Sequence, residues 1–531
     1  MTVNEKPLPP GPRGIDAAKF LFNSTRDFKK PMSEMAIEYG EIAHVRNRGR
    51  DFIVVSGHEA AKHVLITNQD NYRKGLEYEL LRIVLGEGLL TSEGETWRKQ
   101  RRLVQPMFAK RYLKNFTAHM TRATAEVLEG EPFADLPDGE VVDISEAMMA
   151  LTLDIVGRAL FGADLSGKTA RKVGPAMNDV LSLGTKMTRR LPTFVLAHMP
   201  GMNLKKAISV NPEGRRFQRA LEDLKSVIDE LLAERSRQAD PGDDLVGLML
   251  SARDEETGET MSREQIGDEL MTFMLAGHET TSNALAWTWR RLSLNPAARE
   301  RLFEEVDTVL GDRIPDMDDM DRLPWTRACV EESLRIDSPV WTVGRQALDE
   351  DEILGYRIPK HASLMVLISM IHRDPRIWPN PEGYDPSRFL PENAKGRPRH
   401  AFMPFGAGRR VCIGSTFATV EATLLAAMIG RHLRFDLPTG AEVEAEASIT
   451  LRPKHGLPML VFHRRPGPVP DGLISPARGS GPRPARGRAA RPSDPCWRSG
   501  GLRVRRWAAP CRASRGSTMP CHRAASPLPG R

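Results

Sequence analysis

Apolar residues recur at helical spacing along most of the chain, with charged residues on the opposite face. The segment 213–239, EGRRFQRALEDLKSVIDELLAERSRQA, shows this pattern over its whole length. Strand-like stretches are few, and the clearest lie at 41–56 and 350–368. Strands and helices do not alternate regularly, and no solenoid or propeller repeat is present. The pattern therefore predicts a mainly α (α+β) fold, rich in helices with small β-sheets.

One long helix can be predicted with both of its ends. Ser262 is a candidate N-cap, and Gln265 three residues later completes a capping box. The apolar pattern then continues without a break to Asn295 and Pro296, which end it. At 1.5 Å per residue this helix is about 50 Å long. We expect it to cross the whole protein.

The apolar stripe of this helix is interrupted near its middle by the sequence AGHETT, residues 276–281. A threonine within a helix often only donates its hydroxyl to the carbonyl four residues earlier, which for Thr280 is that of Ala276. Here, however, Gly277 leaves room where a side chain would stand, and Glu279 and Thr280 add an acid and a hydroxyl. The pattern favours a helix that passes over a ligand.

The net charge of +7 is not evenly distributed over the 531 residues. Residues 466–531 contain thirteen Arg, no Lys and two acidic residues, a net charge of +11, so that the remainder carries −4. This stretch is rich in Pro, Gly, Ser and Ala and lacks apolar periodicity, which predicts disorder. It is either a basic tail for nucleic acid or a membrane surface, or an incidental extension; the absence of Lys favours the extension. We expect no specific nucleic-acid partner.

The five cysteines do not form a disulfide framework. Three of them (Cys496, Cys511 and Cys521) lie in the basic tail, and Cys329 and Cys412 are far apart in the rest of the chain. A reducing compartment fits this usage. The strongest apolar run, 363–371, is too short to span a bilayer. We expect a soluble, cytoplasmic protein without a transmembrane segment.

The sequence FGAGRRVCIG, residues 405–414, surrounds Cys412 with glycines and arginines. The glycines permit tight turns, and an apolar helix is expected directly afterwards, at 415–433. A cysteine beside positive charge at a helix N-terminus has its thiolate favoured. Such a thiolate could be a nucleophile, a ligand in a zinc or iron–sulfur site, or a single axial ligand of haem iron. A nucleophile needs a nearby base, and the second kind of site needs more Cys or His ligands than this part of the chain offers. A haem ligand needs one cysteine and a sheltering loop.

Five motifs occur in an order that resembles the cytochrome P450 superfamily over residues 7–464. Phe405-x-x-Gly408-x-Arg410-x-Cys412-x-Gly414 matches the haem-binding loop of that family at every defined position, and AGHETT matches its oxygen-activating segment. The others are Glu332-x-x-Arg335, Arg388 in DPSRF (385–389), and Trp97-x-x-x-Arg101 in WRKQR (97–101).

The resemblance implies a cytochrome P450 fold with haem b, held non-covalently between the long helix and the cysteine loop. Cys412 would be the axial ligand and the metal-binding residue, with Phe405 packed beside it. Gly277 would leave space for O2 and substrate, while Glu279 and Thr280 would organise protons. The positions assigned to the haem propionates are Trp97, Arg101, Arg345 and Arg410. The positions assigned to a structural network behind the haem are Glu332, Arg335 and Arg388.

The resemblance further implies a monooxygenase with separate redox partners. Electrons would come ultimately from NAD(P)H through a ferredoxin or flavodoxin with its reductase, which a basic cluster could dock. That cluster is Arg98, Lys99, Arg101, Arg102, Lys110 and Arg111. A solvated helix face is the alternative reading of the cluster.

The expected substrate is a lipophilic small molecule, such as a fatty acid, a terpene or another secondary metabolite. Residues 71–94 and 181–207 are expected to line its pocket, with 186–206 either a substrate lid or a contact to a membrane surface. We expect a monomer with a haem domain at 1–465 and a tail at 466–531. The alternatives are a haem-thiolate peroxygenase or isomerase that needs no redox partner, and a haem-binding sensor.

Overall fold

The structure is a computed structural model. It describes residues 5–464 apart from residues 25, 48, 76, 163–172, 178, 181, 185–211 and 239–241. The expectations for the basic tail, for the 186–206 segment and for much of 181–207 therefore lie outside the described residues.

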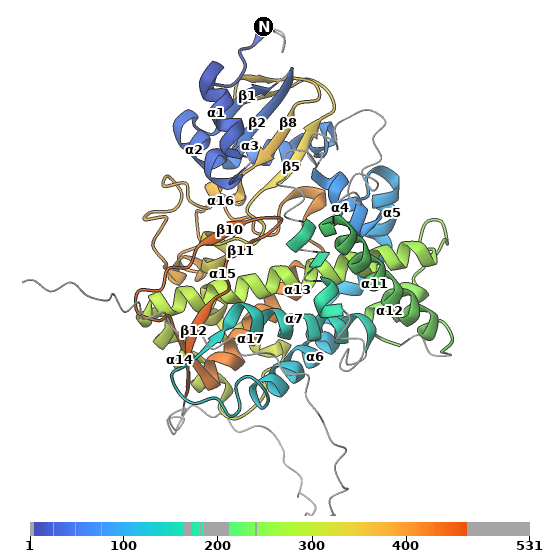
Figure 1. Ribbon diagram of the computed structural model, residues 1–531, viewed down its shortest axis with the longest axis vertical. Helices are drawn as coiled ribbons and strands as arrows, with labels where there is room; N and C mark the ends of the chain where they lie inside the picture. The colour runs from blue at the N-terminus through green and yellow to red at the C-terminus, as the bar shows by residue number, and fades with distance from the viewer. Residues whose placement is uncertain are drawn as a thin grey trace, which may run out of the picture. The chain divides into compact units, whose positions relative to one another are not determined.

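Helices make up most of the described chain (Figure 1). The N-terminal ones are α1 (Gly14–Ser24), α2 (Lys29–Tyr39), α3 (His58–Lys62), α4 (Glu77–Leu85), α5 (Gly94–Val104), α6 (Lys110–Leu128) and α7 (Ile144–Phe161). The later ones are α11 (Pro212–Arg235), α12 (Leu245–Ser251), α13 (Arg263–Leu294), α14 (Pro296–Leu310), α15 (Pro324–Ile336), α16 (Ile368–Ile371) and α17 (Ser415–His432). None of the described helices combines the length and apolarity that crossing a membrane requires.

Helix α13 is the predicted long helix, and it runs across the middle of the helical part (Figure 1). The capping box is present: the Gln265 N–H donates to Ser262 Oγ at 3.1 Å, and the Ser262 N–H donates to Gln265 Oε1 at 2.9 Å. The helix has 32 residues and ends just before Asn295 and Pro296. The predicted start and end are both confirmed.

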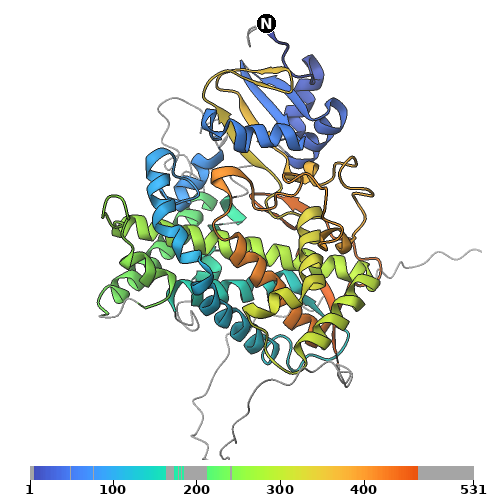
Figure 2. The same ribbon diagram turned by 180° about the vertical axis from the view of Figure 1, so that it is seen from behind.

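Helix α7 packs along α13, while α6 and α17 pack against each other on the side seen in Figure 2. A Cβ atom built on Gly277 of α13 would lie 3.1 Å from Val156 Cγ2 of α7. Glycine at this position therefore serves close packing of the two helices, in addition to any space it leaves for a ligand. Apolar side chains of these helices form the main core.

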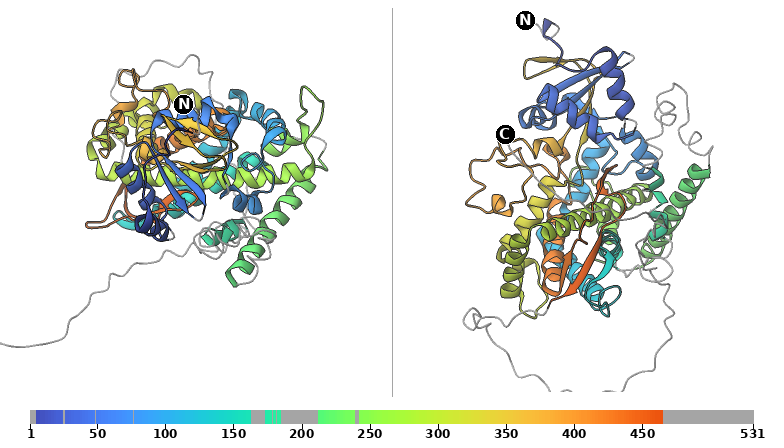
Figure 3. Two further views of the ribbon diagram at one scale, coloured as in Figure 1. Left: turned by 90° about the horizontal axis from the view of Figure 1, so that it is seen from above. Right: turned by 60° about the vertical axis from the view of Figure 1, so that its left-hand side comes forward.

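The largest sheet joins strands from both ends of the chain, in the order β1-β2-β8-β5-β3. Its strands are β1 (Ile42–Asn47), β2 (Arg50–Val55), β3 (Tyr72–Lys74), β5 (Val343–Ala347) and β8 (Ser363–Val366). Figure 3, left, shows these early and late strands side by side. The two predicted strand regions, 41–56 and 350–368, both contribute to it.

The remaining strands form small sheets. Their orders are β4-β12-β9, β10-β11 and β6-β7. The strands are β4 (Glu140–Asp143), β6 (Asp351–Ile353), β7 (Tyr356–Ile358), β9 (Leu433–Asp436), β10 (Ala445–Ala447), β11 (Leu451–Pro453) and β12 (Pro458–His463). Strand β9 lies beside α13 (Figure 3, right). The predicted fold class, mainly helical with small β-sheets, is confirmed.

Candidate active site

The loop that carries Cys412 is a closed turn in front of α17. The Cys412 N–H donates to the carbonyl of Phe405 at 2.9 Å, so the ends of the loop meet. Gly406 and Gly408 have φ angles of +74° and +70°, a conformation that favours glycine. A Cβ on Gly408 would also lie 1.9 Å from the carbonyl oxygen of Leu65. These glycines therefore let the loop fold and pack tightly.

The Cys412 thiol experiences opposing influences. Burial raises its pKa, while the Gly414 N–H and the cation of Arg101 lower it, and burial has the larger effect. The sequence predicts that Arg409 and Arg410 supply the positive charge beside Cys412. Arg409 instead pairs with Asp70 at the surface, and the Arg101 Nη1 donates to the Val411 carbonyl at 3.0 Å. The cation beside the thiol is therefore Arg101 of α5.

The Cys412 loop and the middle of α13 are far apart in the sequence, and each has accessible atoms within the fold. The Cys412 side chain has accessible surface, although protein atoms surround its thiol. Ala276 is exposed near the middle of α13, between Leu275 and His278, which are buried. Phe108 connects the two places: its ring stacks edge-on against Phe273 of α13 at 5.7 Å, and its Cε1 would lie 4.0 Å from a Cβ on Gly414. The Cys412 loop and α13 therefore both pack against Phe108, and each has accessible surface near it.

The two predicted catalytic residues of α13 have different surroundings. Thr280 is half-buried, and its hydroxyl donates to the Ala276 carbonyl at 2.8 Å, the local bond considered above. Glu279 is buried, and its Oε1 accepts a hydrogen bond from the Thr450 hydroxyl at 2.8 Å. Burial raises the pKa of Glu279. The hydroxyl thus lies on the open face of α13, whereas the carboxyl is held by the segment before β11.

The sheet places two cations directly opposite each other. Arg345 of β5 is the register partner of Lys74 at the end of β3, although like charges in this position repel. Burial lowers the pKa of Lys74 to about 6, helped by Arg410 and Arg345. Burial likewise lowers the pKa of Arg410 to about 10. Lys74 was not among the predicted site residues.

Arg410 and Trp97 form a stacked pair. The Arg410 Cζ lies 3.9 Å from the centre of the Trp97 ring, and its Nη1 donates to the Ser92 carbonyl at 3.0 Å. Glu93 lies 3.4 Å from Arg410 Nη2. Within the described part of the chain, this is the single ion pair formed by the basic residues Lys74, Arg101, Arg345 and Arg410. The three arginines therefore outnumber the one carboxylate that pairs with them.

These residues fit a haem group. An accessible thiol and an open helix face both lie near Phe108. Arg101 contacts the cysteine loop, and Arg410 belongs to it. The two propionates of haem b would supply the missing negative charge, because a carboxylate matches the planar donor set of Arg. The predicted residues Cys412, Phe405, Trp97, Arg101, Arg345 and Arg410 are thus brought together, and Lys74 joins them.

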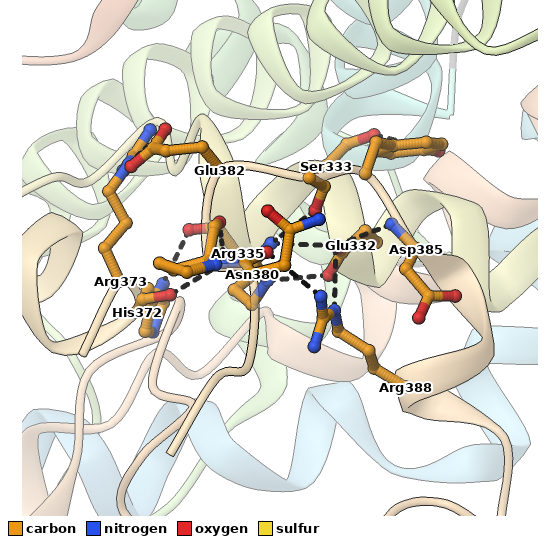
Figure 4. A network of polar contacts seen from close by, with 12 residues as sticks. Glu332, Ser333, Arg335, His372, Arg373, Asn380, Glu382, Asp385 and Arg388 are labelled. Atoms are coloured by element: carbon orange, nitrogen blue, oxygen red, sulfur yellow. Dashed lines mark hydrogen bonds and ion pairs between the residues drawn. The ribbon is translucent and has the colours of Figure 1, made fainter. Parts of the chain in front are cut away.

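The predicted Glu332, Arg335 and Arg388 meet in one buried network (Figure 4). The Arg335 Nε lies 2.7 Å from Glu332 Oε2, and both side chains are 0% exposed. The Arg388 Nε lies 3.4 Å from Glu332 Oε1, which also accepts the Asp385 N–H at 2.9 Å. Arg335 additionally donates to three backbone carbonyls, those of His372, Pro381 and Gly383. The network ties α15 to the segment that follows α16.

His372 extends this network toward the cysteine loop. Its Nε2 accepts the Met403 N–H at 2.9 Å, so the proton lies on Nδ1, which faces the Arg335 carbonyl at 3.2 Å. Burial and the Arg335 cation lower the pKa of His372 to about 3, which keeps the ring neutral. His372 was missed by the sequence reasoning, because a single histidine carries no motif of its own.

A buried acid on α17 lies behind the site. Glu421 is 0% exposed, and neither carboxylate oxygen has a hydrogen-bond partner of normal geometry among the described residues. Burial raises its pKa to about 8, against a smaller opposite effect of Thr281 on α13. The carboxyl is therefore protonated at neutral pH.

Glu421→Gln is expected to make the stability of the protein less dependent on pH. Because the folded-state pKa lies above the usual 4.5, Glu421 favours the folded state below pH 4.5 and loses this contribution as the pH rises toward 8. Between pH 5 and pH 7, the free energy of unfolding of the wild type should fall by about 2–3 kcal/mol relative to that of the variant. Denaturant unfolding at both pH values measures this difference. Parallel pH curves for the two proteins would contradict the assignment.

Comparisons with known proteins agree with this geometry. The family model described as cytochrome P450 matches residues 9–458. Cytochrome P450 132 of Mycobacterium bovis is 38% identical over 432 residues, which cover 78% of this chain and 89% of that protein. Cyclooctatin synthase of Streptomyces melanosporofaciens is 35% identical over 439 residues, covering 81% and 91%. Cyclooctat-9-en-7-ol 5-monooxygenase of the same organism is 30% identical over 410 residues, covering 77% and 85%. The chain therefore belongs to the cytochrome P450 family.

Proposed function

We propose that this cytochrome P450 inserts one oxygen atom of O2 into a lipophilic small molecule, with Cys412 as the thiolate ligand of haem b. The observation that carries the proposal is that Cys412 and the open face of α13 both have accessible surface near Phe108, which packs against the helix and the cysteine loop. When bound, the haem supplies the activation of oxygen, and the thiolate favours cleavage of the O–O bond. The protein supplies binding, orientation and electrostatics.

The cations around Trp97 hold the haem in this proposal. Arg345 and Lys74 reach it from the sheet, Arg410 from the cysteine loop, and Arg101 from α5. Ion pairs with the propionates would relieve the mutual repulsion of these cations. Phe405 shelters the thiolate, since it stands at the other end of the closed turn.

Thr280 and Glu279 manage protons on the distal side in this proposal. The Thr280 hydroxyl lies on the open face, where Oγ1 can accept one proton and donate another as the hydroxyl rotates. Burial raises the pKa of the Glu279 carboxyl, which favours its protonated form. To transfer a proton toward the substrate, the Glu279 carboxyl must give up the hydrogen bond that it accepts from Thr450 and form one with Thr280.

Separate redox partners, a ferredoxin or flavodoxin with its reductase, supply electrons ultimately from NAD(P)H in this proposal. The proposed docking cluster is partly neutralised: Arg98 pairs with Glu95, Lys99 with Glu259, and Arg102 with Asp254. Arg101 is assigned to the haem, so the remaining cations are Lys110 and Arg111. Docking of an acidic partner would therefore rest mainly on these two residues.

The proposed substrate is a lipophilic molecule, in line with the names of two relatives, cyclooctatin synthase and cyclooctat-9-en-7-ol 5-monooxygenase. An optical titration of the purified protein against cyclooctat-9-en-7-ol, other terpenes, fatty acids and polyketides tests this. A change of the haem from low to high spin with one compound class would identify the substrate family. The absence of a thiolate-type haem spectrum would overturn the proposal.

The tail at 466–531 takes no part in this chemistry in our proposal. A chain cut after Arg465 is expected to show the same haem spectrum and the same spin-state response as the full chain, because every proposed site residue lies before residue 465. Loss of the haem spectrum on truncation would contradict this. Cytoplasmic localisation and a monomeric state are further proposals, tested by cell fractionation and by sedimentation.

A further inference from the structure

The loop at residues 86–92, between α4 and α5, lies directly on α13. Gly86 has a φ angle of +56°, and a Cβ built on it would lie 2.1 Å from Asp268 Oδ1. A Cβ on Gly88 would lie 2.3 Å from Thr272 Oγ1. Glycine at both positions therefore lets the loop backbone touch the helix, and side chains there would push it away.

Two consecutive carboxylates of α13 hold this loop by its backbone. The Glu87 N–H donates to Asp268 Oδ2 at 2.8 Å, and the Leu89 N–H donates to Glu269 Oε2 at 3.0 Å. Hydrogen bonds to carboxylates are stronger than those between neutral groups. The two donors are two positions apart in the loop and the two acceptors are adjacent on α13, so the pair of bonds also fixes the register of the loop along the helix.

Glu269 is an unusual residue for the interior of a protein. Its side chain is 0% exposed, and Oε1 has no hydrogen-bond partner among the described residues. Burial raises its pKa to about 7, against the effect of the Leu89 N–H; Asp268 and Lys74 are the charged groups that act on it. Both protonation states keep an oxygen that can accept from Leu89. Burying an acidic side chain costs free energy. The contact observed for Glu269 is the hydrogen bond that it accepts from the Leu89 N–H, which anchors the loop.

The other end of the loop is fixed from the cysteine side. The Arg410 Nη1 donates to the Ser92 carbonyl, and Gln100 of α5 accepts from the Ser92 hydroxyl at 2.5 Å. Gln100 also donates to the Glu87 carbonyl at 2.6 Å. The loop is therefore a strap between α13 and the loop of Cys412.

Leu90 is the apolar side chain of the strap that remains partly uncovered. Leu90 is 36% exposed, whereas its neighbours Leu89, Thr91 and Ser92 are buried. The strap contacts α13 at Thr272. The next residue of α13, Phe273, stacks against Phe108, which also lies beside the Cys412 loop at Gly414. The anchored backbone thus determines where the Leu90 side chain stands.

We propose that Glu269 is a positioning residue, which fixes the 86–92 strap against α13 and so sets the position of Leu90 in the wall of the substrate cavity. The cavity itself rests on the function proposed above. Glu269 does not touch the reacting atoms; it acts through the Leu89 N–H. The affinity for ligands that reach the cavity wall should therefore depend on Glu269, whereas the affinity for ligands that reach only the iron should not.

The test compares Glu269→Leu and Glu269→Gln with the wild type, using haem-loaded protein. Amide hydrogen exchange at Leu89 should become at least about tenfold faster in E269L, which has no acceptor, and should stay close to wild type in E269Q, which keeps one. Optical titration with 4-phenylimidazole should show at least about a fivefold change in Kd for E269L, with unchanged Kd for imidazole. Leu90→Ala should change the phenylimidazole Kd as well, and its effect should not add to that of E269L.

Glu264→Leu is the matched control, because Glu264 is an exposed acid in the first turn of the same helix. It should leave both readouts unchanged. Unchanged exchange at Leu89 in E269L, or additive effects of E269L and L90A, would overturn the proposal. If E269L does not fold, Glu269→Ala is measured and interpreted in the same way. Since exchange at Leu89 is measured apart from ligand binding, failure of this proposal is distinguishable from failure of the proposed function, which would show as an absent thiolate-type haem spectrum.

Discussion

Cys412→Ser is expected to abolish the thiolate-type haem spectrum and to lower oxygenation by at least about a thousandfold, the scale of losing a residue central to catalysis. A serine hydroxyl does not ionise as readily as a thiol, so the variant cannot supply the soft anionic ligand that the mechanism requires. The fold of the loop should persist, because the bond that closes it runs from the backbone N–H of residue 412 to the Phe405 carbonyl. Absorption spectra and product formation measure both effects.

Cys329→Ala is the matched control, because Cys329 is the second free cysteine among the described residues. It is fully buried on α15, and burial raises its pKa, so it is a neutral thiol within the core. The control variant should lose some stability and keep the wild-type spectrum per folded molecule. A thiolate-type spectrum that survived in C412S and disappeared in C329A would contradict the assignment of the ligand.

The features predicted correctly from the sequence depend on nearby residues. The ends of α13 follow from Ser262, Gln265 and Pro296, each of which acts within one turn of the helix. The turn before Cys412 follows from its glycines, and the meeting of Glu332 with Arg335 follows from their spacing on one helix. In each case the physical cause lies within about ten residues of the effect. Such causes can be found in a single sequence.

The features that were missed depend on contacts between distant segments. Lys74 becomes part of the site only because β3 pairs with β5, which sets it opposite Arg345, 271 positions later. His372 matters only because the chain brings Met403 to its Nε2. Neither residue belongs to a motif, and strand register between remote segments is not determined by local pattern.

Burial is the second reason why the structure differs from the predictions made from the sequence. The sequence around Cys412 predicts the influence of the helix N-terminus and of positive charge, and both are present, as the Gly414 N–H and Arg101. Enclosure of the thiol in protein has the larger effect on its pKa, and no local motif predicts it. The same holds for Glu279, which the sequence placed beside a ligand and which the fold encloses with Thr450. Solvent exclusion is a property of the whole fold and cannot be derived from a motif.

Glu332→Ala is expected to lower the free energy of unfolding by about 3–5 kcal/mol, because it leaves Arg335 buried without its counter-charge. The guanidinium would keep its bonds to the His372, Pro381 and Gly383 carbonyls, but these dipoles do not replace a carboxylate. Denaturant unfolding of the haem-loaded protein measures the loss. Glu331→Ala is the matched control. Glu331 pairs with Arg327 four residues earlier on the helix, the Arg327 side chain is 49% exposed, and helix pairs of this spacing contribute about 0.3–0.5 kcal/mol.

The position of the network adds a second expectation for the same variant. Arg335 is linked through His372 to Met403, two residues before the cysteine loop begins at Phe405. If the network holds that loop in place, E332A should release haem at a lower temperature than the wild type, before the helices unfold, whereas E331A should not. Haem absorbance and helical circular dichroism recorded on the same heating ramp separate the two events. Coincident loss of both signals in E332A would show that Glu332 stabilises the whole fold and has no specific effect on the cysteine loop.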